Sequence, residues 1–126
     1  MLAKKNRLSK GQVEFLLRKG IRHKSSNFLV ISKANKAGIN RFCIIISKKL
    51  KLTPIKRTRI RRQIYEAIRK NLGAGQGAAI ANAARPGATY DIALGPNSKI
   101  LEKGFAEMEN EIIYIFKNIF KWVKTS

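Results

Sequence analysis

The stretch RFCIIISKKLKLTPIKRTRIRRQIYEAIRK, residues 41–70, contains the two elements that decide the fold. Its first part, RFCIIIS, is apolar and rich in β-branched side chains, which predicts a strand over 41–47. Because the run CIII shows no polar alternation, we expect both faces of this strand to be buried and the strand to lie in the centre of its sheet.

A helix is expected after this strand. Thr53-Pro54 is typical of a helix start, because threonine can cap the first turn and proline suits the first helical position. Apolar residues then repeat at helical spacing, so the helix is predicted over about 54–71, with its apolar face packed on the sheet. The residues of that face are Ile60, Ile64, Ala67 and Ile68.

Upstream, NFLVISK predicts a second strand over 27–33, and a glycine-containing turn is expected at 35–38. Two strands joined by a short loop predict an antiparallel hairpin between 27–33 and 41–47.

A short helix is expected before these strands. Ser9 and Gln12 form a capping-box pattern, which predicts a helix over about 10–19. Gly20 suits the position that follows its last turn.

The C-terminal half predicts a loop, a strand and a helix. Residues 73–87 are rich in Gly and Ala and predict a loop, with a frayed helical extension through 78–84. TYDIAL predicts a strand over 89–94, and apolar residues at every third or fourth position predict a helix over about 105–122. The chain, 1–126, is therefore expected to be a single domain, an α/β (α+β) single-sheet sandwich with the order α-β-β-α-β-α.

The charge is large and unevenly distributed. The chain has 27 Lys+Arg against 7 Asp+Glu, a net charge of +20, and residues 1–70 hold 21 of the basic residues but only two acids, Glu14 and Glu66. A folded domain seldom tolerates such self-repulsion without a polyanion. We therefore expect a nucleic acid or an anionic membrane as partner, rather than a merely solvated basic surface.

The sequence also constrains compartment and cofactor. No run of about 18 apolar residues predicts a membrane span, and the start MLAKKNRLSK has no apolar segment typical of a signal peptide. The single cysteine, Cys43, suits a reducing cytoplasm and is expected to be an inert buried thiol. One His and one Cys exclude a zinc cluster.

The helix over 54–71 carries most of the candidate phosphate-binding groups. Around its apolar side it presents arginines, whose planar guanidinium can bond two phosphate oxygens and stack on bases. With only Glu66 as a possible acidic partner, phosphate binding is favoured over a solvated face. Lysines just before the helix add cations at its N-terminus, itself favourable to anions. The candidates are Lys48, Lys49, Lys56, Arg57, Arg59, Arg61 and Arg62.

The acidic residues do not predict a nuclease site. A nuclease needs clustered carboxylates for metal ions or a His-based acid and base. Glu107 and Glu111 share a helix face, but with no basic groove beside them we expect solvated side chains. His23 is expected at the surface near phosphate, and Asp91 is either a turn partner or a cleft residue.

Four pieces of the sequence occur in a characteristic order. They are Lys5-Asn6-Arg7-Leu8, Ile45-Ile46-Ser47-Lys48-Lys49, Arg57-Thr58-Arg59-Ile60-Arg61-Arg62 with Glu66-Ala67, and Arg85-Pro86-Gly87 leading to Tyr90-Asp91-Ile92. Over nearly the whole chain this set resembles the protein subunit of bacterial ribonuclease P. The resemblance implies the α-β-β-α-β-α order with a left-handed βαβ crossover, an exception to the usual hand.

The resemblance also implies a function. The family's protein binds a large catalytic RNA, which supplies the active site and its Mg²⁺ ions, and the holoenzyme removes the 5′ leader of precursor tRNA. No cofactor on the protein itself and no protein oligomer are expected. The basic helix would dock on the RNA, with Thr58 standing where the family has Asn.

A cleft between the first helix and the sheet would hold the single-stranded leader. The residues that the resemblance places there are Val13, Leu17, Leu29, Ile31 and Lys33. Val13 and Leu17 align with aromatic residues of the family, so stacking of leader bases is expected to contribute little.

Two other classes fit part of the pattern. A ribosomal or ribosome-assembly RNA-binding protein would have the same charge, size and fold, although the ordered motifs favour ribonuclease P. A membrane-surface protein would need cations and large apolar residues on one amphipathic helix. Here the basic helix has a modest apolar stripe and the apolar C-terminal helix is nearly neutral, so no membrane partner is expected.

Overall fold

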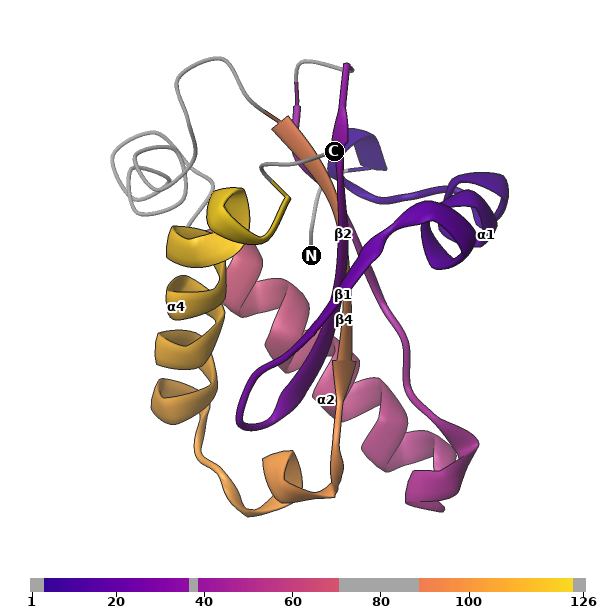
Figure 1. Cartoon of the computed structure of the whole chain (residues 1–126). Coiled ribbons are helices and arrows are strands. Elements are labelled where there is room, and N and C mark those ends of the chain that lie inside the picture. The colour runs from indigo at the N-terminus through magenta and orange to yellow at the C-terminus, as the bar shows by residue number, and fades with distance from the viewer. Residues whose placement is uncertain (1–3, 37–38, 71–88, 124–126) are drawn as a thin grey trace.

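The computed structural model describes residues 4–36, 39–70 and 89–123 (Figure 1). The α-helices are α1 (Lys10–Lys19), α2 (Pro54–Lys70) and α4 (Phe105–Val123), and the strands are β1 (Ile21–Lys24), β2 (Phe28–Asn35), β3 (Arg41–Ile44) and β4 (Thr89–Pro96). Short 3-10 helices precede the α-helices: η1 (Lys4–Asn6), η2 (Lys48–Leu50) and η3 (Ser98–Glu102). The loop predicted over 73–87 and its extension through 78–84 lie outside the described residues.

The strands form one sheet in the order β1-β2-β4-β3. β2 is antiparallel to β1 and to β4, whereas β3 is parallel to β4. α1 packs on one face and α2 and α4 on the other; Figure 1 shows the sheet nearly edge-on between α1 and α4. The predicted single-sheet sandwich is confirmed, as are the helices expected over 10–19, 54–71 and 105–122.

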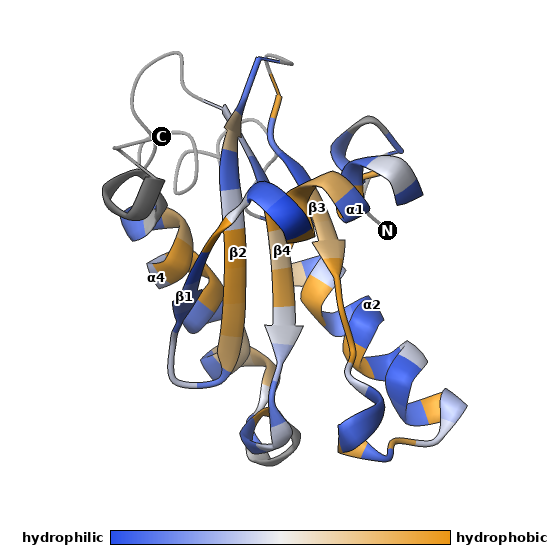
Figure 2. Ribbon diagram, turned by 45° about the vertical axis from the view of Figure 1, so that its right-hand side comes forward, coloured by the Kyte–Doolittle hydropathy of each residue, from blue (hydrophilic) through white to orange (hydrophobic). Residues whose placement is uncertain are grey.

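The connection from β3 through α2 to β4 is a parallel crossover. In Figure 2, which views the sheet from the side of α1, both strands point downward, β4 lies to the left of β3, and α2 lies behind the sheet. After a half-turn of this view in the plane of the page, both strands point upward and β4 lies to the right of β3. The chain then passes behind the sheet from β3 to β4 on its right, and this is a left-handed crossover. The hand implied by the resemblance is therefore confirmed, against the general preference for right-handed connections.

The predicted hairpin between 27–33 and 41–47 is wrong. β2 pairs along its eight residues with β4, and the four-residue β3 pairs with the other edge of β4, so β4 lies between them. Strands adjacent in sequence are usually neighbours in a sheet. Here the eight-residue ladder with β4 satisfies more backbone hydrogen-bonding groups of β2 than pairing with the four-residue β3 would. The hairpin that does form joins β2 to β1, a strand that sequence analysis missed because IRHK has a single apolar residue.

β3 is an edge strand rather than the predicted central one. The strand is apolar because helices cover both of its faces. Phe42 is fully buried against α2 and α4, and Cys43 is 8% exposed beneath α1. The N-terminal segment lies along its outer edge: Arg7 forms a parallel bridge with Phe42, and the Leu8 N–H donates to the Phe42 carbonyl at 2.9 Å. A strand can therefore be apolar throughout without being central.

The main core lies between the sheet and the helices α2 and α4. Phe42 packs on Phe116 of α4 with ring centroids 5.3 Å apart. Thr53 Oγ1 accepts a hydrogen bond from the Lys56 N–H at 3.3 Å, so the predicted cap of α2 is confirmed. The predicted apolar face of α2 is also confirmed, since all four of its residues are buried: Ile60, Ile64, Ala67 and Ile68.

α1 packs on the opposite face of the sheet through a smaller cluster around Leu16 and Ile31. Its capping box is confirmed, since Ser9 and Gln12 exchange hydrogen bonds of 2.8 and 3.3 Å. Gly20 ends the helix with φ at −73°, outside the left-handed region. Glycine is required there for a close approach, because an added Cβ would lie 2.6 Å from both Ile31 Cγ2 and the Leu16 carbonyl oxygen.

Candidate RNA-binding surfaces

The solvent side of α2 is a row of basic side chains. Arg59, Arg61 and Arg62 are exposed, and so are Lys56 and Thr58. The apolar residues of the helix point into the core, so the helical period itself turns these side chains to solvent. The structure therefore brings five of the predicted RNA-binding residues to the outside of one helix.

Arg57, which was predicted with the other arginines to be available to phosphate, is less accessible than they are. It is half-buried, and its Nε atom is buried without a hydrogen-bond partner. The reason is its spacing, because positions 57, 60 and 64 follow the i, i+3, i+7 period of the buried face. Arg57 can therefore offer only part of its guanidinium to a phosphate.

Two shallow depressions run along the outside of α2. One, of about 540 Å³, is lined by Pro54, Ile55, Thr58, Arg59, Arg62 and Gln63. The other, of about 650 Å³, is lined by Thr58, Arg61, Arg62, Gln63, Tyr65, Glu66 and Phe105. Both combine guanidinium groups with apolar or aromatic side chains, which suits phosphates flanked by bases.

The last turn of α2 is electrostatically different from the first turns. Glu66 accepts a hydrogen bond from Arg69 Nε at 3.0 Å and another from a terminal nitrogen of the same guanidinium. These hydrogen bonds lower the pKa of Glu66 and raise the pKa of Arg69. The Lys70 Nζ atom lies 3.8 Å from Glu109 Oε2. The cationic charge available to a ligand is therefore concentrated in the earlier turns of the helix.

Arg7, in the segment that follows the β3 edge, extends this basic surface beyond α2. Burial raises the pKa of the Tyr65 hydroxyl, with Cys43 adding to the shift, whereas Arg61 and Arg7 oppose it. The positive charges of Arg61 and Arg7 therefore act on the same hydroxyl, although the two residues are far apart in sequence.

A groove of about 780 Å³ lies on the opposite face of the sheet, beside α1. Alternation along the strands turns every second side chain to this face, and the apolar ones form the floor of the groove. Figure 2 looks onto this face and shows the apolar middle of the strands. The floor residues are Leu29 and Ile31 of β2, Ile45 just after β3, and Ala93 and Gly95 of β4.

Basic side chains border the apolar floor. Arg22 and Lys24 line the groove from β1 and Lys49 lines it from η2, while Lys48 is exposed outside it. None of the described residues that line the groove is acidic. Sequence analysis missed Arg22 and Lys24, although their i, i+2 spacing is the period that places two side chains on one face of a strand.

Three of the five predicted leader-cleft residues line this groove: Leu17, Leu29 and Ile31. Val13 instead packs in the cluster beneath α1. Lys33 faces the same side of the sheet further along β2, where it is opposite Asp91 in register, and it does not line the groove.

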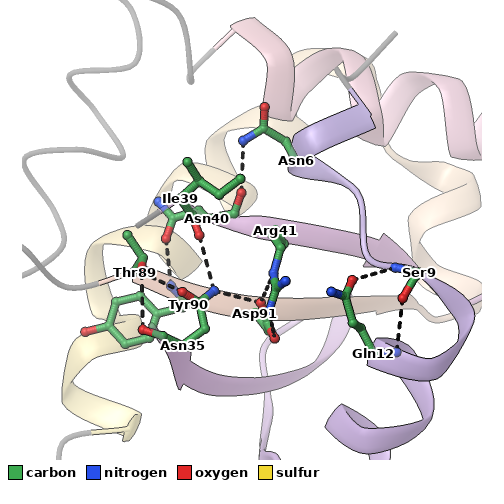
Figure 3. A network of polar contacts seen from close by, with 10 residues as sticks. All are labelled: Asn6, Ser9, Gln12, Asn35, Ile39, Asn40, Arg41, Thr89, Tyr90 and Asp91. Atoms are coloured by element: carbon green, nitrogen blue, oxygen red, sulfur yellow. Dashed lines mark hydrogen bonds and ion pairs between the residues drawn. The ribbon is translucent and has the colours of Figure 1, made fainter. Parts of the chain in front are cut away.

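Asp91 of β4 is held in a network of hydrogen bonds and does not line the groove. Its carboxylate accepts hydrogen bonds from Arg41 at 2.8 and 2.9 Å and from Asn35 Nδ2 at 2.7 Å (Figure 3). In the same network Asn6 donates to the Asn40 carbonyl at 3.0 Å, and Asn40 accepts from a backbone N–H of β4 at 2.8 Å. These bonds join the basic N-terminal segment to β2, β3 and β4 at one end of the sheet.

The other acidic residues do not gather into a metal site. Within residues 4–36, 39–70 and 89–123, no group of three His, Cys, Asp or Glu side chains could hold a metal ion. Glu107 is exposed, as predicted, and lies 3.6 Å from Lys103. Glu111 is not the solvated residue that was predicted, because its carboxylate accepts three hydrogen bonds from Ser25 and Asn27.

Cys43 and His23 provide no reactive pair. Burial, with a contribution from Asp91, raises the pKa of the Cys43 thiol to about 12, so the predicted inert thiol agrees with its environment. His23 is half-buried and, by strand alternation, faces away from the side on which Arg22 and Lys24 line the groove. In the part of the chain that the structure describes, no helix is long and apolar enough to cross a membrane.

Comparison with known proteins identifies the fold and the family. A family model described as Ribonuclease P matches residues 2–119, while a comparison with curated proteins gave no match. The RNase P protein of Thermotoga maritima is 19% identical, with 89% of this chain and 96% of that chain covered and a TM-score of 0.70. The Staphylococcus aureus RNase P protein is 20% identical, with 93% and 97% covered and a TM-score of 0.67.

A Staphylococcus aureus RNase P protein mutant with defective mRNA degradation activity is also similar. It is 22% identical, with 90% of this chain and 87% of that chain covered and a TM-score of 0.67. At these identities the structural similarity shows the fold.

Proposed function

Since this chain belongs to the ribonuclease P protein family, which acts in tRNA 5′ processing with an RNase P RNA, we propose a division of labour between its two basic surfaces. The outside of α2 binds the catalytic RNA, and the groove beside α1 binds the single-stranded 5′ leader of precursor tRNA. The protein thereby assists removal of the leader in the cytoplasm.

The groove is the observation that carries the proposal for the leader. A single strand presents base faces and phosphates together, and the groove offers an apolar floor bordered by the cations Arg22, Lys24 and Lys49. Base stacking contributes little, because the floor residues are aliphatic and Phe28, which also lines the groove, is only 1% exposed. Recognition then depends on phosphates and on the apolar faces common to all bases. Leader binding is therefore expected to show little base preference.

α2 is suited to a structured RNA. A convex helix with Arg59, Arg61 and Arg62 exposed can follow a phosphate backbone, and each guanidinium can bond two phosphate oxygens. Arg7 is exposed in the segment that follows the outer edge of β3, and it offers a further cation to the RNA.

The protein's own part is to bind and to orient the two RNAs. Among the described residues, no group of three His, Cys, Asp or Glu side chains could hold a metal ion. The Mg²⁺ ions and the hydrolytic chemistry are assigned to the RNA subunit.

The test is a reconstituted holoenzyme with the groove altered. Lys24→Ala and Lys49→Ala should weaken binding of precursor tRNA on the order of tenfold each, about one phosphate contact, and leave binding of mature tRNA unchanged. Lys117→Ala, an exposed lysine of α4 on the far face, removes the same charge and is the control. Equal losses for precursor and mature tRNA would contradict the assignment of the groove.

RNA that copurifies with the protein separates this function from a ribosomal one. One abundant structured RNA of a few hundred nucleotides is expected, whereas recovery of ribosomal RNA alone would contradict the proposal.

A further inference from the structure

An acidic residue of α4 holds the turn that ends one side of the groove. Glu111 Oε2 accepts hydrogen bonds from the Ser25 hydroxyl at 2.5 Å and from the Asn27 N–H at 2.8 Å, and Oε1 accepts from Asn27 Nδ2 at 2.5 Å. Ser25 and Asn27 belong to the turn between β1 and β2, which Figure 1 shows beside the N-terminal half of α4.

The same turn is held from its other side by the segment that follows β4. The Asn97 N–H donates to the Asn27 carbonyl at 2.9 Å, and Asn97 Nδ2 donates to the Ser26 carbonyl at 3.3 Å. Within the turn, the Ser25 N–H donates to the Phe28 carbonyl at 2.8 Å. Glu111 is the charged group in this set, and hydrogen bonds to a charged acceptor are roughly twice as strong as neutral ones.

The first residue of the turn and the last residue of β1 both belong to the groove. Lys24 and Ser25 line the groove, and so does Asn97 on the opposite side of the turn. Glu111 does not line it and lies behind the sheet, on the side of α4. Lys24 ends β1, where it pairs with Leu29 of β2, and the turn that begins at the next residue is held by a carboxylate that a bound strand would not touch.

We propose that Glu111 is a positioning residue for leader binding, which fixes the β1–β2 turn so that Lys24 stands at the border of the groove. This inference rests on the proposed function of the groove. A carboxylate repels RNA by its charge alone, so simple electrostatics and positioning predict opposite signs when it is removed. Electrostatics predicts tighter binding of all RNA, whereas positioning predicts weaker binding of the leader only.

The experiment compares Glu111→Ala with Glu107→Ala in reconstituted holoenzyme. Glu107 is on the same helix about one turn earlier, is exposed, and carries the same charge, so it is a matched control. The quantity measured is the ratio of the dissociation constants for mature tRNA and for precursor tRNA, which isolates the leader. Glu111→Ala should lower this ratio on the order of tenfold, the weight of one phosphate contact, and Glu107→Ala should leave it unchanged.

Two further variants separate position from charge and from folding. Glu111→Gln should keep most of the ratio. The amide oxygen of the new glutamine can still accept hydrogen bonds from the turn, and its amide nitrogen can donate to the Asn27 side-chain oxygen once the Asn27 amide has rotated. Asn27→Ala removes one of the three hydrogen bonds without touching a groove residue, and should lower the ratio part of the way. If circular dichroism shows that Glu111→Ala does not fold, the Asn27→Ala variant tests the positioning role in its place.

The inference is overturned if Glu111→Ala, or Asn27→Ala in its place, leaves the ratio equal to that of Glu107→Ala. It is also overturned if mature and precursor tRNA lose affinity equally. Lys24→Ala and Lys49→Ala distinguish failure of the positioning role from failure of the proposed leader site. If these two variants lower the ratio and Glu111→Ala does not, only the positioning role of Glu111 fails. If they do not lower it, the groove itself is not the leader site.

Discussion

Replacement of Arg59, Arg61 and Arg62 together by alanine should weaken binding of the protein to the catalytic RNA and make that binding less dependent on salt. All three side chains are exposed on the outside of α2, and none is paired with a carboxylate among the described residues. Each can therefore neutralise about one phosphate, and the slope of log affinity against log salt should become shallower by about three.

The loss of affinity can be estimated from the same geometry. A solvent-exposed contact contributes near the lower end of the range of about 1–3 kcal/mol for an arginine at a phosphate. For the three residues together, a loss of about 3 kcal/mol, or roughly a hundredfold, is expected at low salt. Replacement of the three by lysine should restore the slope but not all of the affinity, because lysine keeps the charge and loses the planar fork.

Arg69→Ala is the internal control for this prediction. Its guanidinium is already hydrogen-bonded to Glu66, so it has less charge to offer to a phosphate. Its removal should change the slope by less than half of the value for one of the three outer arginines.

The assay is RNA affinity measured across a salt series, with circular dichroism as the control for folding. The packing face of α2 is untouched, so the fold should persist in every variant. An unchanged slope for the triple alanine variant would refute the assignment of α2 as the docking surface. If Arg69→Ala changed the slope as much as each outer arginine does, total charge rather than this surface would control binding.

Three residues give predictions about the fold itself. Ser32→Ala should raise the free energy of unfolding by about 1 kcal/mol in urea titrations, because the Ser32 hydroxyl is buried without a partner and its removal relieves a desolvation cost; destabilisation would mean that the hydroxyl is satisfied. Asp91→Ala should lower the free energy of unfolding by about 2–3 kcal/mol, since it leaves the largely buried Arg41 unpaired; a loss below about 0.5 kcal/mol would contradict this structural role. Cys43 should react with a thiol reagent at pH 8 about a thousandfold more slowly in the folded than in the denatured protein, because its pKa is raised from 9.0 to about 12. Equal reactivity in the folded and denatured states would show that the thiol is accessible. Because between those pKa values the thiol ionises only in the unfolded chain, the free energy of unfolding should also fall as pH rises above about 9.

The helices and their surfaces could be read from the sequence with few errors. The capping residues Ser9 and Thr53 and the period of Ile60, Ile64 and Ile68 are local signals, and each determines structure within one or two helical turns. The half-buried position of Arg57 was available from the same period, since it continues the buried row by one turn toward the N-terminus.

The sheet and the groove could not be read in this way. β1 carries one apolar residue, so no pattern in IRHK marks it as a strand until β2 pairs with it. The apolar run of β3 was correctly read as buried on both faces, but burial does not state which strand lies beside it. Lys24 and Lys49 become partners in one groove only after β1 and η2 are brought to the same face of the sheet.

The amino-acid sequence by itself determined the three helices, the concentration of charge in residues 1–70, and the ordered motifs that mark the family. Those features are properties of neighbouring residues, for which the helical period, the caps and the composition are sufficient. Only the tertiary structure decided that β4 separates β2 from β3, that Asp91 closes a network at one end of the sheet, and that Glu111 holds the turn beside Lys24. The physical reason is that strand pairing and buried polar contacts depend on groups 50 to 86 residues apart in the chain, and no local pattern encodes which distant donor meets which acceptor.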